Sequence, residues 1–231
     1  MAREKTALLV ETCRESGIAD ASILAIEMLV SSSSTSEDVI AACRKSRRNQ
    51  EEIEEDKMST ETITLEEFMT GDYPSYEYVK GQLVPMPEPT MEHGEISSNI
   101  HFLLSTHVRQ HQLGRIYTAE TTFPIGKSGR KPDVAFVSQE QLPDNRRQAS
   151  PVPPDLAIEV VSPSDKAYDI QEKVFEYLDA GTKLVWVINP VLKTVTVYRS
   201  QDDIKILTRN QTLTGEDVVE GFSCSVEEIF A

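Results

Sequence analysis

Cysteine, long apolar runs and positive charge are all scarce in this sequence, and each shortage excludes a class of protein. There are 3 cysteines in 231 residues, at the widely separated positions Cys13, Cys43 and Cys224. An odd, scattered set excludes a disulfide scaffold and a cysteine-rich zinc site, and it indicates free thiols in a reducing cytoplasm. No apolar run approaches the ~18 residues that a membrane span needs, and the first residues form no secretion signal. We therefore expect a cytoplasmic protein with no membrane partner.

Negative charge dominates: 38 aspartates and glutamates stand against 23 lysines and arginines, for a net charge of −15. A field of this sign repels nucleic acid at long range. Because salt screens surface fields beyond roughly 10 Å, local basic patches can still contact a phosphate backbone. The candidate patches are Lys127, Arg130 and Lys131, and, in a following loop, Arg146 and Arg147. The alternative is that these residues form a solvated turn and a solvated loop.

The length of the chain, 231 residues with 39% hydrophobic residues, fits one substantial globular core with a small appendage. Residues 1–57 carry short apolar runs at helical spacing and no strand pattern, so we predict a helical extension or linker there. Residues 58–231 alternate strand-like and helix-like segments, which predicts an α/β domain with a mixed sheet.

Helix and turn signals organise the first part of this domain. Thr64 to Glu67 fits a capping box that begins a short helix, and residues 76–79 and 82–86 are predicted to form a hairpin. The strongest helix pattern covers residues 90–113 and is expected to end at Gly114. Further strands are predicted at residues 115–118, 121–125, 183–189, 194–198 and 204–208, with a turn at residues 126–129 and a helix cap at Ser225.

Two short, mostly apolar strands, residues 131–137 and 155–161, carry the carboxylates of Asp133 and Glu159. A buried carboxylate has a large desolvation cost unless it is neutralised, hydrogen-bonded or bound to a cation. If the strands are neighbours, the two carboxylates can lie about 4 Å apart and repel by roughly 4 kcal/mol at an effective dielectric near 20. A divalent cation between them would reverse the sign of this interaction.

A helix is predicted after the second acidic strand, with Ser164 or Asp165 as its N-cap and Gly181 as its end. Its buried face is predicted to hold Ile170, Val174, Tyr177 and Leu178. Lys173 lies at the edge of that face. It either forms a salt bridge with Asp169, four residues earlier, or projects toward the two carboxylates.

Four motifs follow one another in a fixed order: Tyr76 to Leu83; Pro132-Asp133-Val134; Glu159-Val160-Val161-Ser162-Pro163-Ser164; and Lys173 followed by Tyr177, Ala180-Gly181 and residues 184–190. Together, over residues 64–231, they resemble the Uma-two family of restriction endonucleases, which belongs to the PD-(D/E)xK nuclease superfamily. The resemblance implies a restriction-endonuclease-like mixed β-sheet flanked by helices. It also implies hydrolysis of phosphodiester bonds in DNA.

The resemblance implies roles for single residues as well. Asp133 and Glu159 would bind Mg²⁺, with Mn²⁺ as an alternative ion and the carbonyl of Val160 as a further ligand. The superfamily pattern places a lysine two residues after the glutamate, but Val161 occupies that position. Lys173 matches the lysine that the Uma-two pattern carries on the next helix, where it would orient or deprotonate the attacking water.

Two further residues join the candidate catalytic site through the same resemblance. Glu77 lies on the first hairpin strand, where it joins the acidic cluster or, by strand alternation, faces solvent. His93 falls within the apolar stripe of the long helix, where it borders the active site or is a satisfied core histidine.

The function predicted from these features is a Mg²⁺-dependent DNA endonuclease. A homodimer is compatible with it, since restriction-type enzymes often cut both strands as dimers. A catalytically inactive nuclease-like binding or regulatory module is the alternative. The charge of −15 and Val161 favour this alternative, whereas the intact set of Asp133, Glu159 and Lys173 opposes it.

Overall fold

The described part of the chain is residues 63–231, and its structure is a computed structural model. The helical extension predicted for residues 1–57, and the domain boundary beside it, lie outside these residues. Among the described helices, none is both long and apolar enough to cross a membrane.

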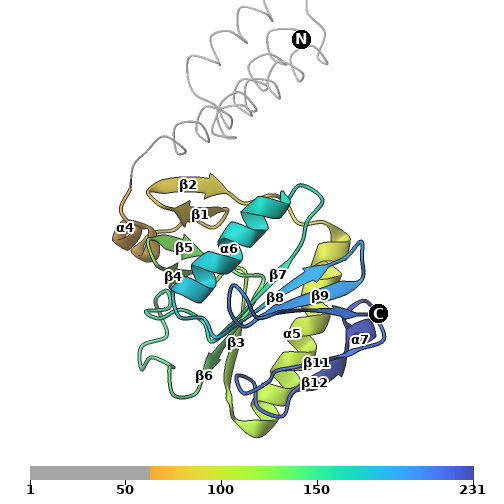
Figure 1. Ribbon diagram of the computed structural model, residues 1–231. Coiled ribbons are helices and arrows are strands. Elements are labelled where there is room, and N and C mark those ends of the chain that lie inside the picture. Colours follow the sequence, from red (N-terminus) through yellow and green to blue (C-terminus); the bar gives the residue numbers. More distant parts are fainter. Residues whose placement is uncertain (1–62) are drawn as a thin grey trace, which may run out of the picture. The chain divides into compact units, whose positions relative to one another are not determined.

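The described part of the domain begins with helix α4, Leu65–Thr70, and a small antiparallel sheet follows it (Figure 1). The predicted capping box is confirmed: the Thr64 hydroxyl accepts from the Glu67 N–H at 3.2 Å, and the Glu67 carboxylate accepts from the Thr64 N–H at 2.7 Å. The strand order is β2-β1-β5-β4, with bounds Tyr76–Val79 (β1), Gln82–Pro85 (β2), Phe123–Ile125 (β4) and Ser128–Arg130 (β5). Strands β1 and β2 form the predicted hairpin.

The turn predicted at residues 126–129 is shorter than expected. Ser128 and Gly129 belong to β5, which pairs with both β1 and β4. Gly129 passes close to Phe68, since a Cβ atom on this glycine would lie 2.7 Å from the ring. The pairing leaves only Gly126 and Lys127 for the turn, and Gly126 adopts a positive φ of 60°.

A six-stranded sheet forms the centre of the domain, in the order β10-β9-β8-β7-β6-β3. Its strands are Gly114–Thr118 (β3), Val134–Ser138 (β6), Leu156–Val160 (β7), Leu184–Asn189 (β8), Thr194–Tyr198 (β9) and Ile204–Thr208 (β10). All neighbours are antiparallel except β7 and β8, which are parallel and are connected through helix α6, Ala167–Asp179. The predicted mixed α/β sheet is therefore confirmed, with the two acidic strands as neighbours.

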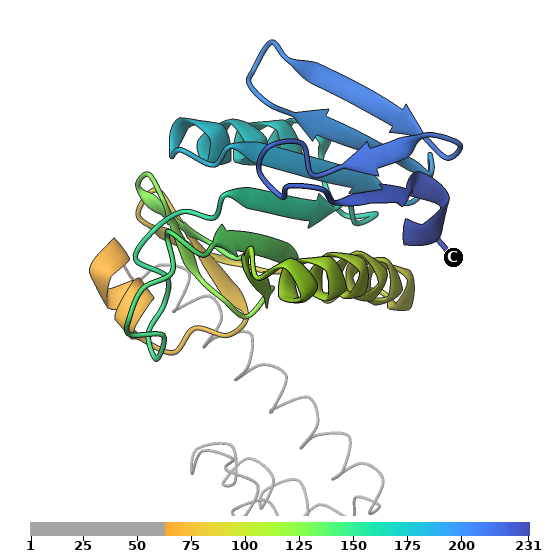
Figure 2. The same ribbon diagram turned by 90° about the horizontal axis from the view of Figure 1, so that it is seen from below.

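The two faces of this sheet carry alternate side chains of β6, β7 and β8. One face packs on helix α5, Met91–His111, through large residues such as Ile158 and Trp186. The other face packs on α6 through smaller residues such as Ala157. Figures 1 and 2 show the two helices on opposite sides of the sheet. Because Glu159 alternates with Ile158, its side chain is directed to the α6 side.

Helix α5 ends differently from the prediction. It begins, as expected, after Thr90, whose hydroxyl accepts from the His93 N–H at 3.2 Å. It ends at His111, and the C-cap residue Gln112 takes the left-handed conformation with a φ of 56°. Gly114 is not the terminator, because it already starts β3 and pairs there with Ser138.

Helix α6 begins without the predicted side-chain cap. Lys166 occupies the cap position and makes no capping hydrogen bond with its side chain. The Asp165 carboxylate accepts instead from the Ser162 N–H at 2.7 Å, which closes the turn between β7 and the helix. The C-terminal end is near the predicted glycine: Ala180 is the C-cap, and Gly181 follows with a φ of 103°.

The chain finishes with a hairpin and a short helix against α5. The hairpin strands are Thr212–Thr214 (β11) and Ser223–Ser225 (β12), and the helix is Val226–Ile229 (α7). Ser225 caps α7 as predicted, since its hydroxyl accepts from the Glu227 N–H at 3.2 Å. This unit extends the apolar core on the α5 face of the sheet.

Candidate active site

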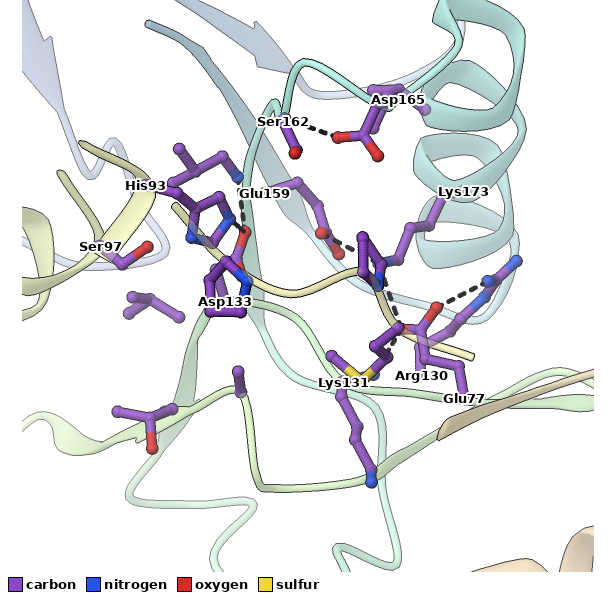
Figure 3. A pocket seen from close by; sticks show the side chains of 18 of the residues that line it. Glu77, His93, Ser97, Arg130, Lys131, Asp133, Glu159, Ser162, Asp165 and Lys173 are labelled. Carbon is purple, nitrogen blue, oxygen red and sulfur yellow. Dashed lines mark hydrogen bonds and ion pairs between the residues drawn. The ribbon is translucent and has the colours of Figure 1, made fainter. Parts of the chain in front are cut away.

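The five predicted site residues meet in one cavity of about 720 Å³ (Figure 3). Glu77 comes from β1, His93 from α5, Asp133 from the segment before β6, Glu159 from β7 and Lys173 from α6. The cavity therefore lies where the small sheet, the centre of the main sheet and both long helices come together.

Asp133 stands immediately before β6 and caps the neighbouring strand. The β6–β7 ladder ends at the pair Val134–Ile158, so the N–H of Val160 lies beyond it. Asp133 Oδ2 accepts from this N–H at 2.7 Å and lies 3.2 Å from His93 Nε2. His93 thus borders the site and contacts its first carboxylate, rather than being enclosed in the apolar core.

Glu159 is almost fully buried on the α6 side of the sheet, with 5% of its surface exposed. Two residues one helical turn apart on α6 bind it: Lys173 Nζ donates to Oε2 at 3.0 Å, and the Tyr177 hydroxyl donates to Oε1 at 2.7 Å. The salt bridge between Lys173 and Asp169, which the sequence left open, is not formed. Lys173 is directed to the carboxylates instead.

Glu77 is buried as well, so the solvent-facing alternative is wrong. Its carboxylate lies 3.1 Å from Lys173 Nζ and accepts from Arg130 Nη1 at 3.0 Å and from the Lys131 N–H at 2.8 Å. Arg130 continues to Glu176 on α6, at 2.6 Å from Nη2. The carboxylate and the guanidinium therefore join the small sheet to the helix that carries Lys173.

The two glutamates respond in opposite ways to the same burial. Burial raises the pKa of Glu159 to about 7, against the favourable charge of Lys173 and with the repulsion of Asp133 added. Burial also opposes ionisation of Glu77, but the charges of Lys173 and Arg130 outweigh it and lower its pKa. The difference follows from the partners, because Glu77 has two cations and Glu159 shares one.

Lys173 and His93 are both held toward their charged forms. Burial alone would lower the pKa of Lys173, but the charges of Glu159 and Glu77 outweigh it and raise the pKa. The hydrogen bond to Asp133 raises the pKa of His93, against its partial burial. Lys173 is therefore a protonated donor at neutral pH.

The model of the Uma2 family, described as "Putative restriction endonuclease", matches residues 62–227 of this chain. The chain belongs to the Uma2 family. This confirms the resemblance of the sequence motifs, and membership places the chain among the nucleases.

A solved structure shares the fold of this Uma2 chain. It is the crystal structure of a "putative nuclease belonging to DUF820" from Anabaena variabilis ATCC 29413. The two chains are 23% identical and superpose with a TM-score of 0.64, over 73% of this chain and 97% of the other. No curated protein matches the chain significantly.

Two of the three cations in the basic patch predicted beside Asp133 are buried and paired within the domain. Arg130 is buried between Glu77 and Glu176. Lys131 is only 4% exposed, and its ammonium donates to the backbone oxygen of Tyr73 at 2.5 Å. Both cations are used inside the domain. The exposed cation of that group is Lys127, and Arg146 and Arg147 are exposed in their loop.

Two residues were not predicted as partners of the site carboxylates, although both were predicted in other roles from the sequence. Tyr177 was expected on the buried face of α6, and its spacing of four residues from Lys173 was the available signal for a shared partner. Arg130 gave no such signal, because its partners, Glu77 and Glu176, lie 53 and 46 residues away in the sequence.

Oxygen ligands for a hard cation are concentrated at Asp133 and Glu159. Asp133 Oδ2 receives both hydrogen bonds described for that residue, and each oxygen of Glu159 receives one, so both carboxylates keep lone pairs for a cation. Within residues 63–231, no three His, Cys, Asp or Glu side chains are arranged to hold a metal by themselves. Mg²⁺ often takes one or two carboxylates and keeps several waters, so this donor set fits it.

Proposed function

We propose that this Uma2 chain is a Mg²⁺-dependent endonuclease that hydrolyses phosphodiester bonds in DNA. One observation carries the proposal: the carboxylates of Glu77, Asp133 and Glu159 and the ammonium of Lys173 line the same cavity, although they come from four segments. Grouping three carboxylates in a recess is costly unless cations compensate them. Glu77 has Arg130 and Lys173, but Glu159 has only a share of Lys173 and its pKa stays raised. A further cation is therefore the expected occupant.

Asp133 and Glu159 are the residues that would hold this ion. Both are fixed by neutral donors: Asp133 by the Val160 N–H, and Glu159 by the Tyr177 hydroxyl. Such outer partners orient ligand carboxylates and keep them in one conformation. When bound, Mg²⁺ would supply a water of lowered pKa and neutralise charge on the scissile phosphate.

Lys173 would act as a donor to the reacting phosphate. Its pKa is raised by Glu159 and Glu77, so it carries a proton at neutral pH. Of the two roles that the resemblance implied, holding the attacking water or accepting its proton, the charged state supports the first. A fixed ammonium also stabilises the negative charge that grows on the phosphate oxygens in the transition state.

The experiment is cleavage of supercoiled plasmid by the full chain, with Mg²⁺, with Mn²⁺ and with chelator. The wild type is compared with Glu159→Gln and with Glu140→Gln, which changes an exposed glutamate in the loop after β6. We expect metal-dependent nicking or linearisation by the wild type and by Glu140→Gln, and a loss of at least about 100-fold in Glu159→Gln.

Cleavage that persists in chelator, or that survives Glu159→Gln, would contradict the proposal. Absence of cleavage together with absence of metal binding would instead favour the alternative of a nuclease-like module without activity. The carboxylates of Asp133 and Glu159 would then be vestigial.

A further inference from the structure

The cavity that holds the carboxylates has one wall made by helix α5. The residues of this wall are small or polar and recur at helical spacing: His93, Gly94, Ser97, Ser98 and His101. A Cβ atom on Gly94 would meet nothing within 4 Å, so the wall is open at this point. Ser97 Oγ is buried and has no hydrogen-bond partner among the described residues (Figure 3). A buried hydroxyl without a partner, beside open space, is suited to a polar ligand.

A second part of the lining is mostly apolar. It is formed by the end of β2 and the segment that leads into α5, with the apolar residues Val84, Pro85, Met86, Pro87 and Pro89 and one acidic residue, Glu88. Val84 is 40% exposed although it is a large apolar residue at the edge of a polar site. Prolines restrict the backbone of this segment, so the apolar wall is held in place before a ligand arrives.

The cations that line the cavity are already engaged. Lys173 binds Glu159 and Glu77, Arg130 binds Glu77 and Glu176, and Lys131 donates to backbone oxygens. Double-stranded DNA gains most of its affinity for proteins from lysine and arginine contacts to phosphates. Apart from Lys173, which the proposed function places beside the reacting phosphate, the lining offers a duplex no lysine or arginine that is free to contact its backbone. An unpaired nucleotide can compensate, because its base can leave the stack and lie against apolar side chains.

We infer that the cavity takes one unpaired nucleotide beside the scissile phosphate, so that the substrate is single-stranded or locally unpaired DNA. The inference rests on the proposed nuclease function. The base lies against the apolar wall, and the sugar and phosphate follow α5 past Gly94 toward the carboxylates. A volume of about 720 Å³ lies within the range of sites that enclose small molecules.

Gly94 gives this inference a second support. Glycine inside a helix is destabilising relative to alanine. This one lies in the first turns of α5, and no packing neighbour requires it to lack a side chain. A glycine at such a position allows a ligand to approach the backbone closely.

The test is binding of a fluorescent single-stranded oligonucleotide and of the same sequence as a duplex, by anisotropy, to the full chain in Ca²⁺ and in chelator. Gly94→Phe fills the cavity from the open side. Gln110→Phe places the same side chain at an exposed site near the end of the same helix and is the control. Thermal unfolding of both variants verifies that they fold.

We expect the single strand to bind at least about tenfold more tightly than the duplex. Gly94→Phe should lose at least about tenfold of that affinity, and Gln110→Phe should keep it. Equal or tighter binding of the duplex, no effect of Gly94→Phe in a folded variant, or no binding of either oligonucleotide would overturn the inference. Selective single-strand binding without any metal-dependent cleavage would support the inference while refuting the proposed nuclease activity, so the two failures are distinguishable.

Discussion

Replacement of Glu159 by glutamine should stabilise the metal-free protein at alkaline pH. Burial raises the pKa of this carboxyl from its ordinary value of 4.5 to about 7. A folded-state pKa above the unfolded value means that the folded protein holds the proton more tightly. The stabilisation from the neutral carboxyl is therefore complete below pH 4.5 and is lost as the pH rises through 7.

The magnitude follows from the size of this shift. A difference of one pKa unit corresponds to about 1.4 kcal/mol, so ionised Glu159 costs on the order of 3 kcal/mol above pH 7. Glutamine does not ionise, but it accepts a weaker hydrogen bond from Lys173, which reduces the gain by about 1 kcal/mol. We expect Glu159→Gln to be about 2 kcal/mol more stable at pH 8, or roughly 4–8 °C in melting temperature, and nearly equal to the wild type at pH 5.

The assay is thermal unfolding of the full chain at pH 5 and pH 8 with chelator, and again at pH 8 with Mg²⁺. An ion present at about 100 times its dissociation constant adds about 2.7 kcal/mol to the wild type and nothing to a variant that does not bind it. Mg²⁺ should therefore remove the advantage of Glu159→Gln. Glu140→Gln should melt like the wild type throughout. A Glu159→Gln protein that melts below the wild type at pH 8 in chelator would refute the reasoning, because the buried charge would then be fully compensated by Lys173 and Tyr177.

Substitutions at three further residues test the contacts of the candidate site. Tyr177→Phe removes the hydroxyl that donates to Glu159 at 2.7 Å. We expect a loss of about 1–2 kcal/mol in the free energy of urea unfolding and weaker metal binding by calorimetry. Unchanged values would show that the hydrogen bond is dispensable. Arg130→Met leaves Glu77 and Glu176 without their shared cation, which should lower the free energy of unfolding by about 3–5 kcal/mol. Arg130→Lys keeps the charge and should lower it much less. Equal losses of stability in the two variants would contradict a role of charge. Lys173→Met should reduce single-turnover cleavage by at least about 100-fold while metal binding remains, and a parallel loss of metal binding would indicate that Lys173 acts only by holding the carboxylates.

Much of the sheet could be predicted because its central strands bury both faces. Residues 134–138 and 156–160 are then almost continuously apolar, and a carboxylate in or beside such a run stands out. Asp133 and Glu159 were identifiable for this reason. Whether their strands are neighbours was left open by the sequence, and the pair Val134–Ile158 shows that they are.

The surroundings of the site could not be predicted, since they depend on contacts between distant segments. Lys127, Arg130 and Lys131 look like one basic patch in the sequence, yet two of them are buried. Glu77 lies on the small sheet, and its carboxylate lowers the free-energy cost of burying the Arg130 guanidinium. Local spacing carries no information about a partner 53 residues away.

Element ends were predicted less well than element centres. Ser128 and Gly129, predicted to lie in the turn before Asp133, belong to β5 instead. Strand β5 pairs with β1, and this pairing forms only in the assembled small sheet. Asp165 is a residue type that often caps helices, but its carboxylate closes the preceding turn instead. In both cases a second local structure competed for the same residues.

Calorimetric titration of Mg²⁺ into the full chain measures whether Asp133 and Glu159 form a metal site. We predict one site in the wild type and in Glu140→Gln, and none in Asp133→Asn or Glu159→Gln, with all four proteins folded. Equal binding by the wild type and by both site variants, or no binding by the wild type at neutral pH, would contradict the account.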